Sequence, residues 1–569
     1  MMRHITLFLL LLSTPYIAFA QERTKYWIFL SDKVDIAGKN TQVEEGYLTD
    51  NALLRRTLRG QPEAAAMIAF QDAPISRVYE DDLLQKDITI INRSRWLNAV
   101  TAKLSEEEAK QIASLSYVRD IRPVAVLSTS TQPNIPVSPL IPERVSSNCP
   151  SAIFGNSCNQ LDVVNAILPI QRGINGDGVV LGFLDTKFNI PGSRPFTHTS
   201  LKHIPDDGRL MEVRDFTERD PAQPCGGTNT HGMSVASVAV GYDEGDVIGP
   251  GYGASIYAAS TECSPYERNI EEDNFVMGVE WMESEGVDVI TSSLGYLDFD
   301  DDPGQRNYTG SDLDGDTGLT TIIMDWAAQR GIVTVTSAGN GGPGPQTLGT
   351  PADGDSVIAV GGVRPTKELW FSSSRGPTAD GRIKPDVSGQ ASRVLVASGA
   401  SGYGASAGTS FSAPMIAGIV TQILQVNPGL GPMDVWQVLT STASQSGSPD
   451  NDLGWGIVDA DAAIKSAILL NSTQDLLPSP DKLIIHTPYP NPFYDVAHFI
   501  IESVEPITHA QLKIFDVLGR EIATVHSGSL QTGGTPIQFD GRHLRPGVYA
   551  YILEYDGKLQ SGIMTRLGQ

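Results

Sequence analysis

Between residues 149 and 470 the sequence alternates short apolar runs with longer segments of helical periodicity. The short runs predict buried strands at residues 179–184, 287–290, 332–335 and 357–360. The longer segments predict helices at residues 231–240, 272–285, 319–330, 410–425 and 433–442. This alternation is typical of an α/β fold, a doubly wound parallel sheet with helices on both faces. In such sheets the functional site lies beyond the carboxyl ends of the strands, which directs attention to the residues that follow them.

The residues before this region predict a small α+β domain over 21–127. It contains strand-like runs at 26–30, 96–102 and 118–126 and an amphipathic helix at 105–114. Ser105 is the expected N-cap of that helix, with Glu108 completing a capping box. Residues 128–148 are rich in Ser, Thr, Pro and Gln and predict a linker.

The residues after the α/β region have the pattern of a β-sandwich. Residues 471–482 are polar, contain two prolines and predict a second linker. From 483 to 569 short strands alternate with Gly-rich turns. The predicted strands are at residues 510–516, 521–525, 535–539, 548–554 and 559–565. From this pattern alone, a carbohydrate- or protein-binding sandwich is an equally good interpretation.

The first 20 residues predict a secretory signal peptide. Arg3 and His4 precede an apolar run at 5–12, and Ala18-Phe19-Ala20 forms a small-residue cleavage site before Gln21. An uncleaved anchor is the alternative, which the small residues at the expected cut disfavour. No later segment is apolar for long enough to predict a transmembrane helix in the mature chain.

Charge and cysteine content further limit the partners and cofactor sites that this protein can have. The formal net charge of −25 argues against a nucleic acid partner, because phosphate contacts need clustered Lys and Arg. The four cysteines are Cys149, Cys158, Cys225 and Cys263. An even number in an exported chain predicts two disulfides, with three pairings open. The short loop favours Cys149–Cys158, leaving Cys225–Cys263, and the lack of a Cys-x-x-Cys spacing argues against a zinc-thiolate site.

Two residues are candidates for a catalytic base and the group that orients it. His231 opens a predicted helix of small residues, which allows close packing on the sheet, whereas His198 and His203 lie in a polar stretch. Asp185 directly follows the first predicted strand of the sheet, where a carboxylate must be paired or hydrogen-bonded. Each has a plain structural alternative, a helix-start histidine and a turn aspartate.

A serine and an amide complete the set. Ser410 lies in Gly408-Thr409-Ser410-Phe411-Ser412-Ala413-Pro414, at the start of a predicted helix whose free N–H groups favour an oxyanion. We expect Pro414 in the first turn, where its missing N–H costs nothing. Asn340 follows a strand within Ser337-Ala338-Gly339-Asn340 and can donate to an oxyanion. An N-cap serine and a glycine turn are the structural alternatives.

Taken together, these motifs resemble the subtilisin-like serine proteases, or subtilases. The order Asp185, His231, Asn340, Ser410 is the order of that family, whose catalytic triad is Asp-His-Ser. The resemblance covers residues 149–470. It implies a secreted serine endopeptidase that needs no cofactor for its chemistry and acts on protein or peptide substrates.

The resemblance assigns roles to further segments. Ser293, Leu294 and Gly295 match the strand that pairs with the substrate backbone, and residues 21–127 match an inhibitory propeptide. The last domain resembles the sorting domain of the type IX secretion system of Bacteroidetes-like bacteria, through residues 488–493, 512–520 and 544–549. This implies export by that machinery and an extracellular or cell-surface location on a Gram-negative bacterium.

One position departs from the family pattern. Members usually carry glycine two residues after the catalytic aspartate, and Lys187 stands there. This lysine either competes for Asp185 or points to solvent, and we expect the second.

Two acidic clusters raise the question of a metal. The clusters comprise Asp298, Asp300, Asp301 and Asp302, followed by Asp312, Asp314 and Asp316. Oxygen-rich loops suit structural Ca²⁺, but the spacing falls short of an EF-hand, and a solvated loop is an equally good interpretation.

Two rival functions remain open at this point. One is a non-catalytic binding protein on a protease scaffold, which would usually have lost a triad residue. The other is a peptide ligase that uses the same acyl-enzyme, which product masses would distinguish from hydrolysis.

Overall fold

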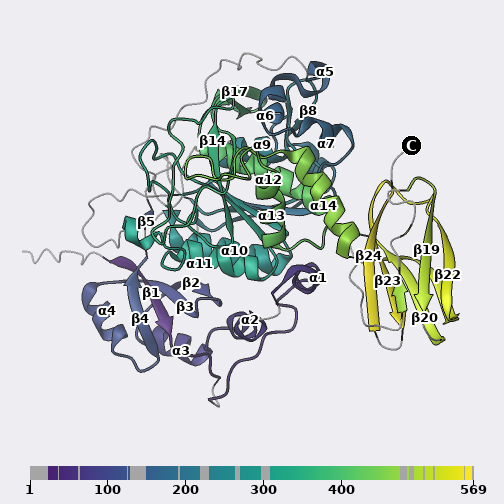
Figure 1. The fold of residues 1–569 in the computed structure, drawn as a ribbon. Helices are drawn as coiled ribbons and strands as arrows, with labels where there is room; N and C mark the ends of the chain where they lie inside the picture. The colour runs from purple at the N-terminus through teal and green to yellow at the C-terminus, as the bar shows by residue number, and fades with distance from the viewer. Residues whose placement is uncertain are drawn as a thin grey trace, which may run out of the picture.

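The chain forms three domains in the computed structural model (Figure 1). The structure describes residues 23–35, 38–61, 64–124, 126–127, 149–189, 192–217, 230–262, 270–295, 308–474, 483–485, 488, 493–503, 506–516, 520–555 and 558–566. The expected signal peptide, the whole first linker, Cys225, Cys263 and the aspartates at 298–302 lie outside these residues.

The N-terminal domain is an antiparallel sheet with helices, as its pattern predicted. Its strand order is β2-β3-β1-β4, formed by Ile90–Ser94, Ala99–Leu104, Thr24–Leu30 and Val118–Pro123. Its helices are α1 (Asp50–Arg59), α2 (Ala65–Asp72), α3 (Arg77–Gln85) and α4 (Glu106–Ala113). Ser105 and Glu108 form the predicted capping box of α4. The strand expected at 118–126 divides, because β4 ends at Pro123 and a separate strand, β5 (Val126–Leu127), leaves the domain.

The central domain is built on a seven-stranded sheet in which every neighbouring pair of strands is parallel. The order β15-β14-β13-β12-β6-β10-β7 corresponds to Val387–Gln390, Val357–Val363, Val333–Ser337, Val289–Ser292, Val180–Asp185, Ser255–Ser260 and Leu210–Asp215. The four predicted strands are therefore β6, β12, β13 and β14, each within two residues of its expected start.

Helices cover both faces of this sheet, and the sheet separates two apolar clusters, one on each face. On one face lie α9 (His231–Val240) and α12 (Thr409–Val426), with α13 (Pro432–Thr442) and α14 (Ala460–Gln474) outside them. On the other lie α10 (Glu272–Glu285) and α11 (Leu319–Gln329). Because α14 runs to Gln474, the domain extends four residues into the expected second linker.

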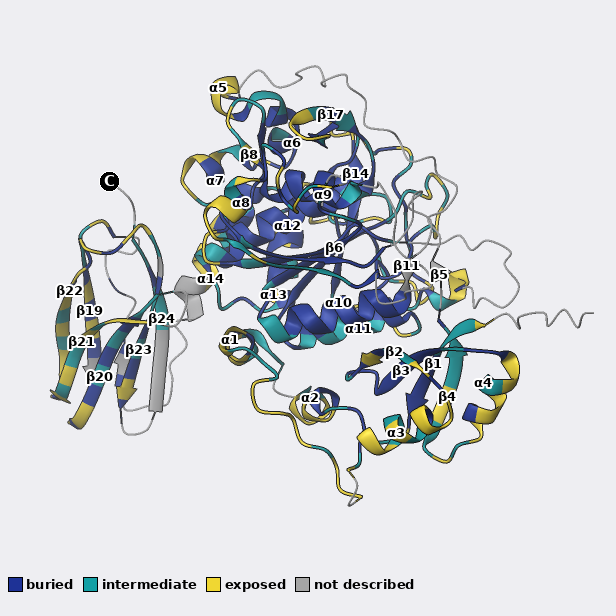
Figure 2. Cartoon of the chain, turned by 180° about the vertical axis from the view of Figure 1, so that it is seen from behind, coloured by how far each residue is buried: buried dark blue, intermediate teal, exposed yellow. Residues whose placement is uncertain are grey.

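Helix α12 is the central core helix of this domain. Within the described residues, it alone is long and apolar enough to cross a membrane, yet 83% of it is buried inside the protein. Figure 2 shows it enclosed beside β6. Its apolar character is therefore explained by its place between the sheet and the outer helices.

Short elements surround the sheet. The helices are α5 (Ser151–Phe154), α6 (Cys158–Val163), α7 (Ile167–Gln171) and α8 (His203–Asp206). The strands are β8 (Tyr242–Asp243), β9 (Val247–Ile248), β11 (Ile270–Glu271), β16 (Val394–Ser398) and β17 (Gly402–Ser406).

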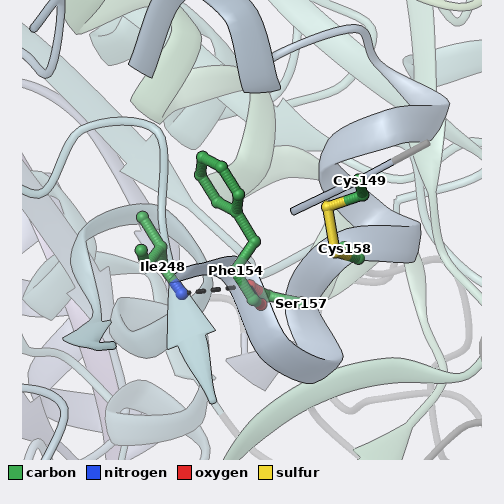
Figure 3. The surroundings of a disulfide bond; sticks show 5 residues. All are labelled: Cys149, Phe154, Ser157, Cys158 and Ile248. Carbon is green, nitrogen blue, oxygen red and sulfur yellow. Dashed lines mark hydrogen bonds between the residues drawn. A yellow bond between two sulfur atoms is a disulfide. The ribbon is translucent and has the colours of Figure 1, made fainter. Parts of the chain in front are cut away.

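A disulfide joins Cys149 to Cys158 in this periphery, the pairing favoured by the short loop (Figure 3). The loop it closes contains α5, whose Phe154 is fully buried. Ser157 ties the loop to the domain, because its Oγ accepts a hydrogen bond from the N–H of Ile248 at 3.1 Å. The bridge therefore closes the loop, and the Ser157 hydrogen bond attaches it to β9.

The C-terminal domain is a β-sandwich, as predicted. One sheet has the order β18-β19-β22, formed by Leu483–Ile485, Val496–Ser503 and Gly533–Asp540. The other has the order β21-β20-β23-β24, formed by Glu521–Leu530, Ile507–Phe515, Gly547–Tyr555 and Lys558–Arg566. One apolar cluster fills the domain, with Phe499 and Tyr551 in edge-to-face contact.

Candidate active site

Asp185 is the last residue of β6, a strand near the middle of the sheet, and is fully buried. Its Oδ1 accepts hydrogen bonds from the N–H of Thr186 at 2.7 Å and from Nδ1 of His231 at 2.8 Å. A buried carboxylate requires such donors. The position therefore lies at the carboxyl edge of the sheet, where the fold class predicts a functional site.

His231 is the first residue of α9, and the start of that helix is fixed against the turn after β6. The N–H of Gly232 donates to Oγ1 of Thr186 at 2.9 Å. A Cβ at Gly232 would lie 3.1 Å from the carbonyl oxygens of Thr186 and Lys187, so only glycine allows this approach without displacement. Because Nδ1 is directed at Asp185, Nε2 is the ring nitrogen that can take up a proton from a nucleophile.

The other two histidines of the described central domain have structural surroundings. His198 is fully buried between Ser200 and the carbonyl of Gly402, and burial lowers its pKa. Burial also lowers the pKa of His203 to about 4, so that its ring is neutral at physiological pH. Neither has a carboxylate hydrogen-bonded to its ring, in contrast to His231.

Lys187 neither competes for Asp185 nor points freely to solvent, so the expectation for this position was wrong. Its Nζ lies 3.4 Å from Oδ2 of Asp215, the last residue of β7, and its side chain is 21% exposed. Asp215 thus holds the cation away from the Asp185–His231 pair, and the departure from the family pattern leaves that pair intact.

Ser410 is the second residue of α12, and its surroundings link it to the segment after β12. Its Oγ donates to the carbonyl oxygen of Ser293 at 3.3 Å, and Oγ of Ser293 donates to the carbonyl of Ser410 at 2.8 Å. The ring of the next residue, Phe411, lies 5.7 Å from the imidazole of His231, between ring centroids. The structure therefore brings Asp185, His231 and the amino-terminal turn of α12 together.

Pro414 lies in the second turn of α12 rather than the first, because the helix begins at Thr409. A residue with an N–H at that position would bond to the carbonyl of Ser410, four residues earlier. The proline leaves this carbonyl available, and the hydroxyl of Ser293 binds it. The proline thus permits the contact between α12 and the segment after β12.

Asn340 lies beyond β13, and its side chain is held by Thr409. Its Oδ1 accepts from both the N–H and the Oγ1 of Thr409, each at 3.0 Å. Its amide nitrogen therefore remains to donate. A Cβ built on Gly408 would lie 3.6 Å from Nδ2 of Asn340 and 3.7 Å from the N of Ser410. The two expected oxyanion donors thus border the same space beside Gly408.

The segment 293–295 follows β12 at the carboxyl edge of the sheet, as its family motif implied. Leu294 is buried, and Gly295 lies against the carbonyl oxygens of Ser337 and Thr350. Directly before α10, β11 forms a two-residue antiparallel ladder with β5 of the N-terminal domain. The register pairs Ile270 with Leu127 and Glu271 with Val126.

Sequence reasoning missed Thr186, Thr409 and β11. The two threonines act through side-chain hydrogen bonds to distant segments, which no local periodicity reveals. Thr409 has one signal in the sequence, its place inside the Gly408–Ser410 motif. Strand β11 is too short to show strand alternation.

The described acidic residues form no metal site. The side chain of Asp312 caps Thr309, and the side chain of Asp314 accepts the N–H groups of Asp316 and Thr317. Among the described residues, no group of three or more His, Cys, Asp or Glu side chains could hold a metal ion.

Comparison with known families assigns all three domains. Residues 176–456 match the Subtilase family, and residues 25–136 match the peptidase S8 propeptide domain of Bacteroidota. Residues 487–562 match the secretion system C-terminal sorting domain.

Individual relatives agree with this assignment. The chain is 31% identical to subtilisin DY from Bacillus licheniformis over 297 residues, covering 51% of this chain and 93% of that protein. It is 25% identical to serine protease AprX from Bacillus subtilis (strain 168), covering 51% and 67%. The solved structure of the epidermin leader peptide processing serine protease from Staphylococcus aureus shares the fold. It aligns with a TM-score of 0.51 and 14% identity, covering 78% of this chain and 99% of that one.

A buried aspartate thus lies with a half-buried histidine and a half-buried serine at the carboxyl edge of a parallel sheet. The chain also matches a subtilisin over 93% of that protein's length. The N-terminal and C-terminal domains match a Bacteroidota propeptide and a sorting domain. The chain belongs to the subtilase family and is a subtilisin-like serine endopeptidase with its propeptide, secreted by Bacteroidota through a type IX sorting domain.

Proposed function

We propose that this endopeptidase hydrolyses peptide bonds through an acyl-enzyme on Ser410, with His231 as base and Asp185 as its orienting carboxylate. The observation that carries the proposal is the Asp185–His231 hydrogen bond beside the first turn of α12, where Ser410 lies. That arrangement supplies a nucleophile, a base and a buried anion that supports the charged imidazole.

In the proposed reaction, the Oγ of Ser410 attacks the peptide carbonyl while His231 takes its proton. The oxyanion of the tetrahedral intermediate accepts hydrogen bonds from Nδ2 of Asn340 and the N–H of Ser410. His231 then protonates the leaving amine, and water hydrolyses the acyl-enzyme by the reverse sequence of proton transfers. Residues 293–295 bind the substrate backbone as an added strand.

We further propose that residues 21–127 hold the enzyme inactive until they are cleaved. The β5–β11 ladder supports this, because it lays the end of the N-terminal domain along the edge of the loop before α10 as an extended strand. A substrate would bind in the same extended form. The expected cleavage therefore lies shortly after Leu127, inside the segment 128–148.

The test compares the wild-type chain, begun at Gln21, with Ser410→Ala and with Ser441→Ala as a matched control on an exposed face of α13. Wild type and Ser441→Ala should lose about 100 residues on incubation and react with a fluorophosphonate probe. Ser410→Ala should do neither. Labelling of Ser410→Ala, or peptide products joined without addition of water, would overturn the proposed mechanism.

A further inference from the structure

Helix α1 of the propeptide lies across the carboxyl-terminal ends of two protease helices, α10 and α11. The last carbonyls of any helix lack partners inside it. Here the backbone N–H and Oγ1 of Thr49 donate to the carbonyl of Ser284 at 3.0 and 3.1 Å. The N–H of Gln61 donates to the carbonyl of Gln329 at 2.9 Å. Both ends of the α1 segment therefore satisfy carbonyls at the ends of the protease helices.

Arg55, between these two contacts, fills a socket made of protease oxygens. Its Nη1 donates to the carbonyl of Val287 at 2.7 Å, its Nε to that of Arg330 at 3.2 Å, and its Nη2 to that of Glu283 at 3.2 Å. Nη2 also pairs with the Glu283 carboxylate. The side chains of Arg55 and Glu283 are 1% and 0% exposed. Three carbonyls and one carboxylate around a planar fork match a guanidinium better than an ammonium.

The protease backbone is shaped for this helix. Gly286 and Gly331 end the turns after α10 and α11 with φ of +90° and +86°. A Cβ at Gly286 would lie 2.6 Å from Cβ of Asn51, and one at Gly331 would lie 2.8 Å from Cβ of Arg59. A larger residue at either glycine would displace α1.

Two further arginines add charge pairing around the socket. Arg56 binds both carboxylate oxygens of Glu283, each at 2.8 Å, and Arg59 pairs with Asp288. These bonds join residues that are more than 220 positions apart in the chain. The acidic end of α10 is thus covered by three arginines from a single helix.

The socket is remote from the β5–β11 ladder. Strand β11, which holds β5, directly precedes the first turn of α10, whereas Glu283 lies in its last turn. A helix of 14 residues spans about 20 Å. Figure 1 shows β5 and α1 at opposite ends of α10. A cut after β5 removes the covalent link at one end and leaves the contact at the other.

We propose that the ends of α10 and α11 form an arginine-binding socket, a site for a guanidinium group presented by a helix, which retains the propeptide after cleavage. The socket comprises the carbonyls of Glu283, Val287 and Arg330 and the carboxylate of Glu283. Retention of a cleaved propeptide rests on the proposed function above, but occupation of the socket does not.

The first experiment measures amide hydrogen exchange of residues 50–60 in the full Ser410→Ala chain, which is expected to stay uncut. Arg55→Gln and Arg55→Lys should each speed this exchange at least tenfold. Arg93→Gln is the matched control, because Arg93 pairs with Glu80 within the propeptide and its side chain is 52% exposed. Full protection in Arg55→Gln would overturn the socket, and full protection in Arg55→Lys would overturn its preference for guanidinium.

Arg55→Gln could act by unfolding the propeptide, in which case α4 would also lose its protection from hydrogen exchange. A variant on the protease side tests the socket without this complication. Glu283→Gln keeps the socket's carbonyls and leaves the propeptide sequence unchanged. It should speed exchange at 50–60 at least tenfold while α4 stays protected, and unchanged exchange at 50–60 would overturn the proposal.

The second experiment uses chains able to cleave themselves and follows release of the cut propeptide by gel filtration. Arg55→Gln should release it at least tenfold faster than wild type and Arg93→Gln, and equal rates would overturn retention by the socket. If wild type and Arg93→Gln remain uncut, the proposed function fails, and the exchange experiment still decides the socket.

Discussion

The hydrogen bond between Asp185 and His231 sets which nitrogen of the imidazole is available as a base. Nδ1 lies 2.8 Å from the carboxylate oxygen and donates to it, so in the neutral ring Nε2 carries the lone pair. In the proposed mechanism, Asp185→Asn removes the negative charge that stabilises the imidazolium during attack. We expect the first-order rate of propeptide cleavage to fall about 10⁴-fold, as in other proteases with this triad.

Intact mass over time measures that rate without a separate activation step. Glu212→Gln is the matched control, because it removes an exposed carboxylate of β7 that pairs with Arg214 and contacts neither Asp185 nor Lys187 in the structure. Its rate should stay within a few-fold of wild type. Equal losses in the two variants would mean that general electrostatics near β6, and not the His231 contact, governs the rate.

Asn340 allows a second test at a single residue. Asn340→Ala removes the Nδ2 donor and also the oxygen that binds Thr409. Loss of the corresponding donor in subtilisin lowers turnover about 10²–10³-fold, and we expect the same here. With a peptide substrate, kcat should fall while KM changes little, because the oxyanion develops during attack and is absent from the bound substrate. If KM rises and kcat does not change, Asn340 acts in substrate binding and not in stabilising the oxyanion.

The sequence predicted which residues would lie at this edge of the sheet, and it predicted little of how they are held. Asp185, His231, Asn340 and Ser410 each lie in a local motif at the end of a strand or the start of a helix, which the fold class brings to one edge. The bond from Ser293 to the carbonyl of Ser410 depends on a proline four residues later and on a loop 117 residues earlier. No short stretch of sequence contains both Pro414 and Ser293, so a local pattern cannot predict this bond.

At the scale of elements, periodic segments were predicted well and charged short helices were not. Helices α9 and α10 match their expected bounds at both ends. Helix α1 was missed, because its arginines find their partners on α10 and beyond it, 227 to 275 residues away. Strand β10 was also missed, since its Ser and Ala residues give a weak apolar signal although the strand is almost wholly buried.

The disulfide at the start of the central domain should stabilise α5 and α6. It closes a short loop, with a sequence separation of 9, and this should contribute about 3 kcal/mol by restricting the unfolded segment. The double variant Cys149→Ser/Cys158→Ser should therefore raise hydrogen exchange across residues 149–163. Dithiothreitol should have the same effect on wild type and none on the variant. Unchanged exchange would show that packing of Phe154 alone holds this loop.

At the scale of the whole molecule, one buried carboxylate couples propeptide binding to pH. Glu280 of α10 accepts hydrogen bonds from the Oγ of Ser94, the N–H of Arg95 at 3.0 Å and the N–H of Trp96 at 3.3 Å, all in the propeptide. Burial raises its pKa from 4.5 to about 7 in this complex. Burial also lowers the pKa of nearby Lys33 to about 7, but the carbonyls that bind Lys33 all belong to the propeptide and accompany it on release.

The pKa of Glu280 therefore predicts release of the cleaved propeptide as pH rises. Because release exposes Glu280 and returns its pKa toward 4.5, the complex binds an extra proton between these values. The contribution of Glu280 to the binding free energy of the propeptide is complete below about pH 4.5 and is lost as the pH rises through about 7. Linkage then gives about tenfold tighter binding at pH 6 than at pH 8. Gel filtration of the processed chain at both pH values measures this difference. Glu280→Gln cannot titrate and should show a much smaller one, so an equal pH dependence in that variant would assign the effect to other groups.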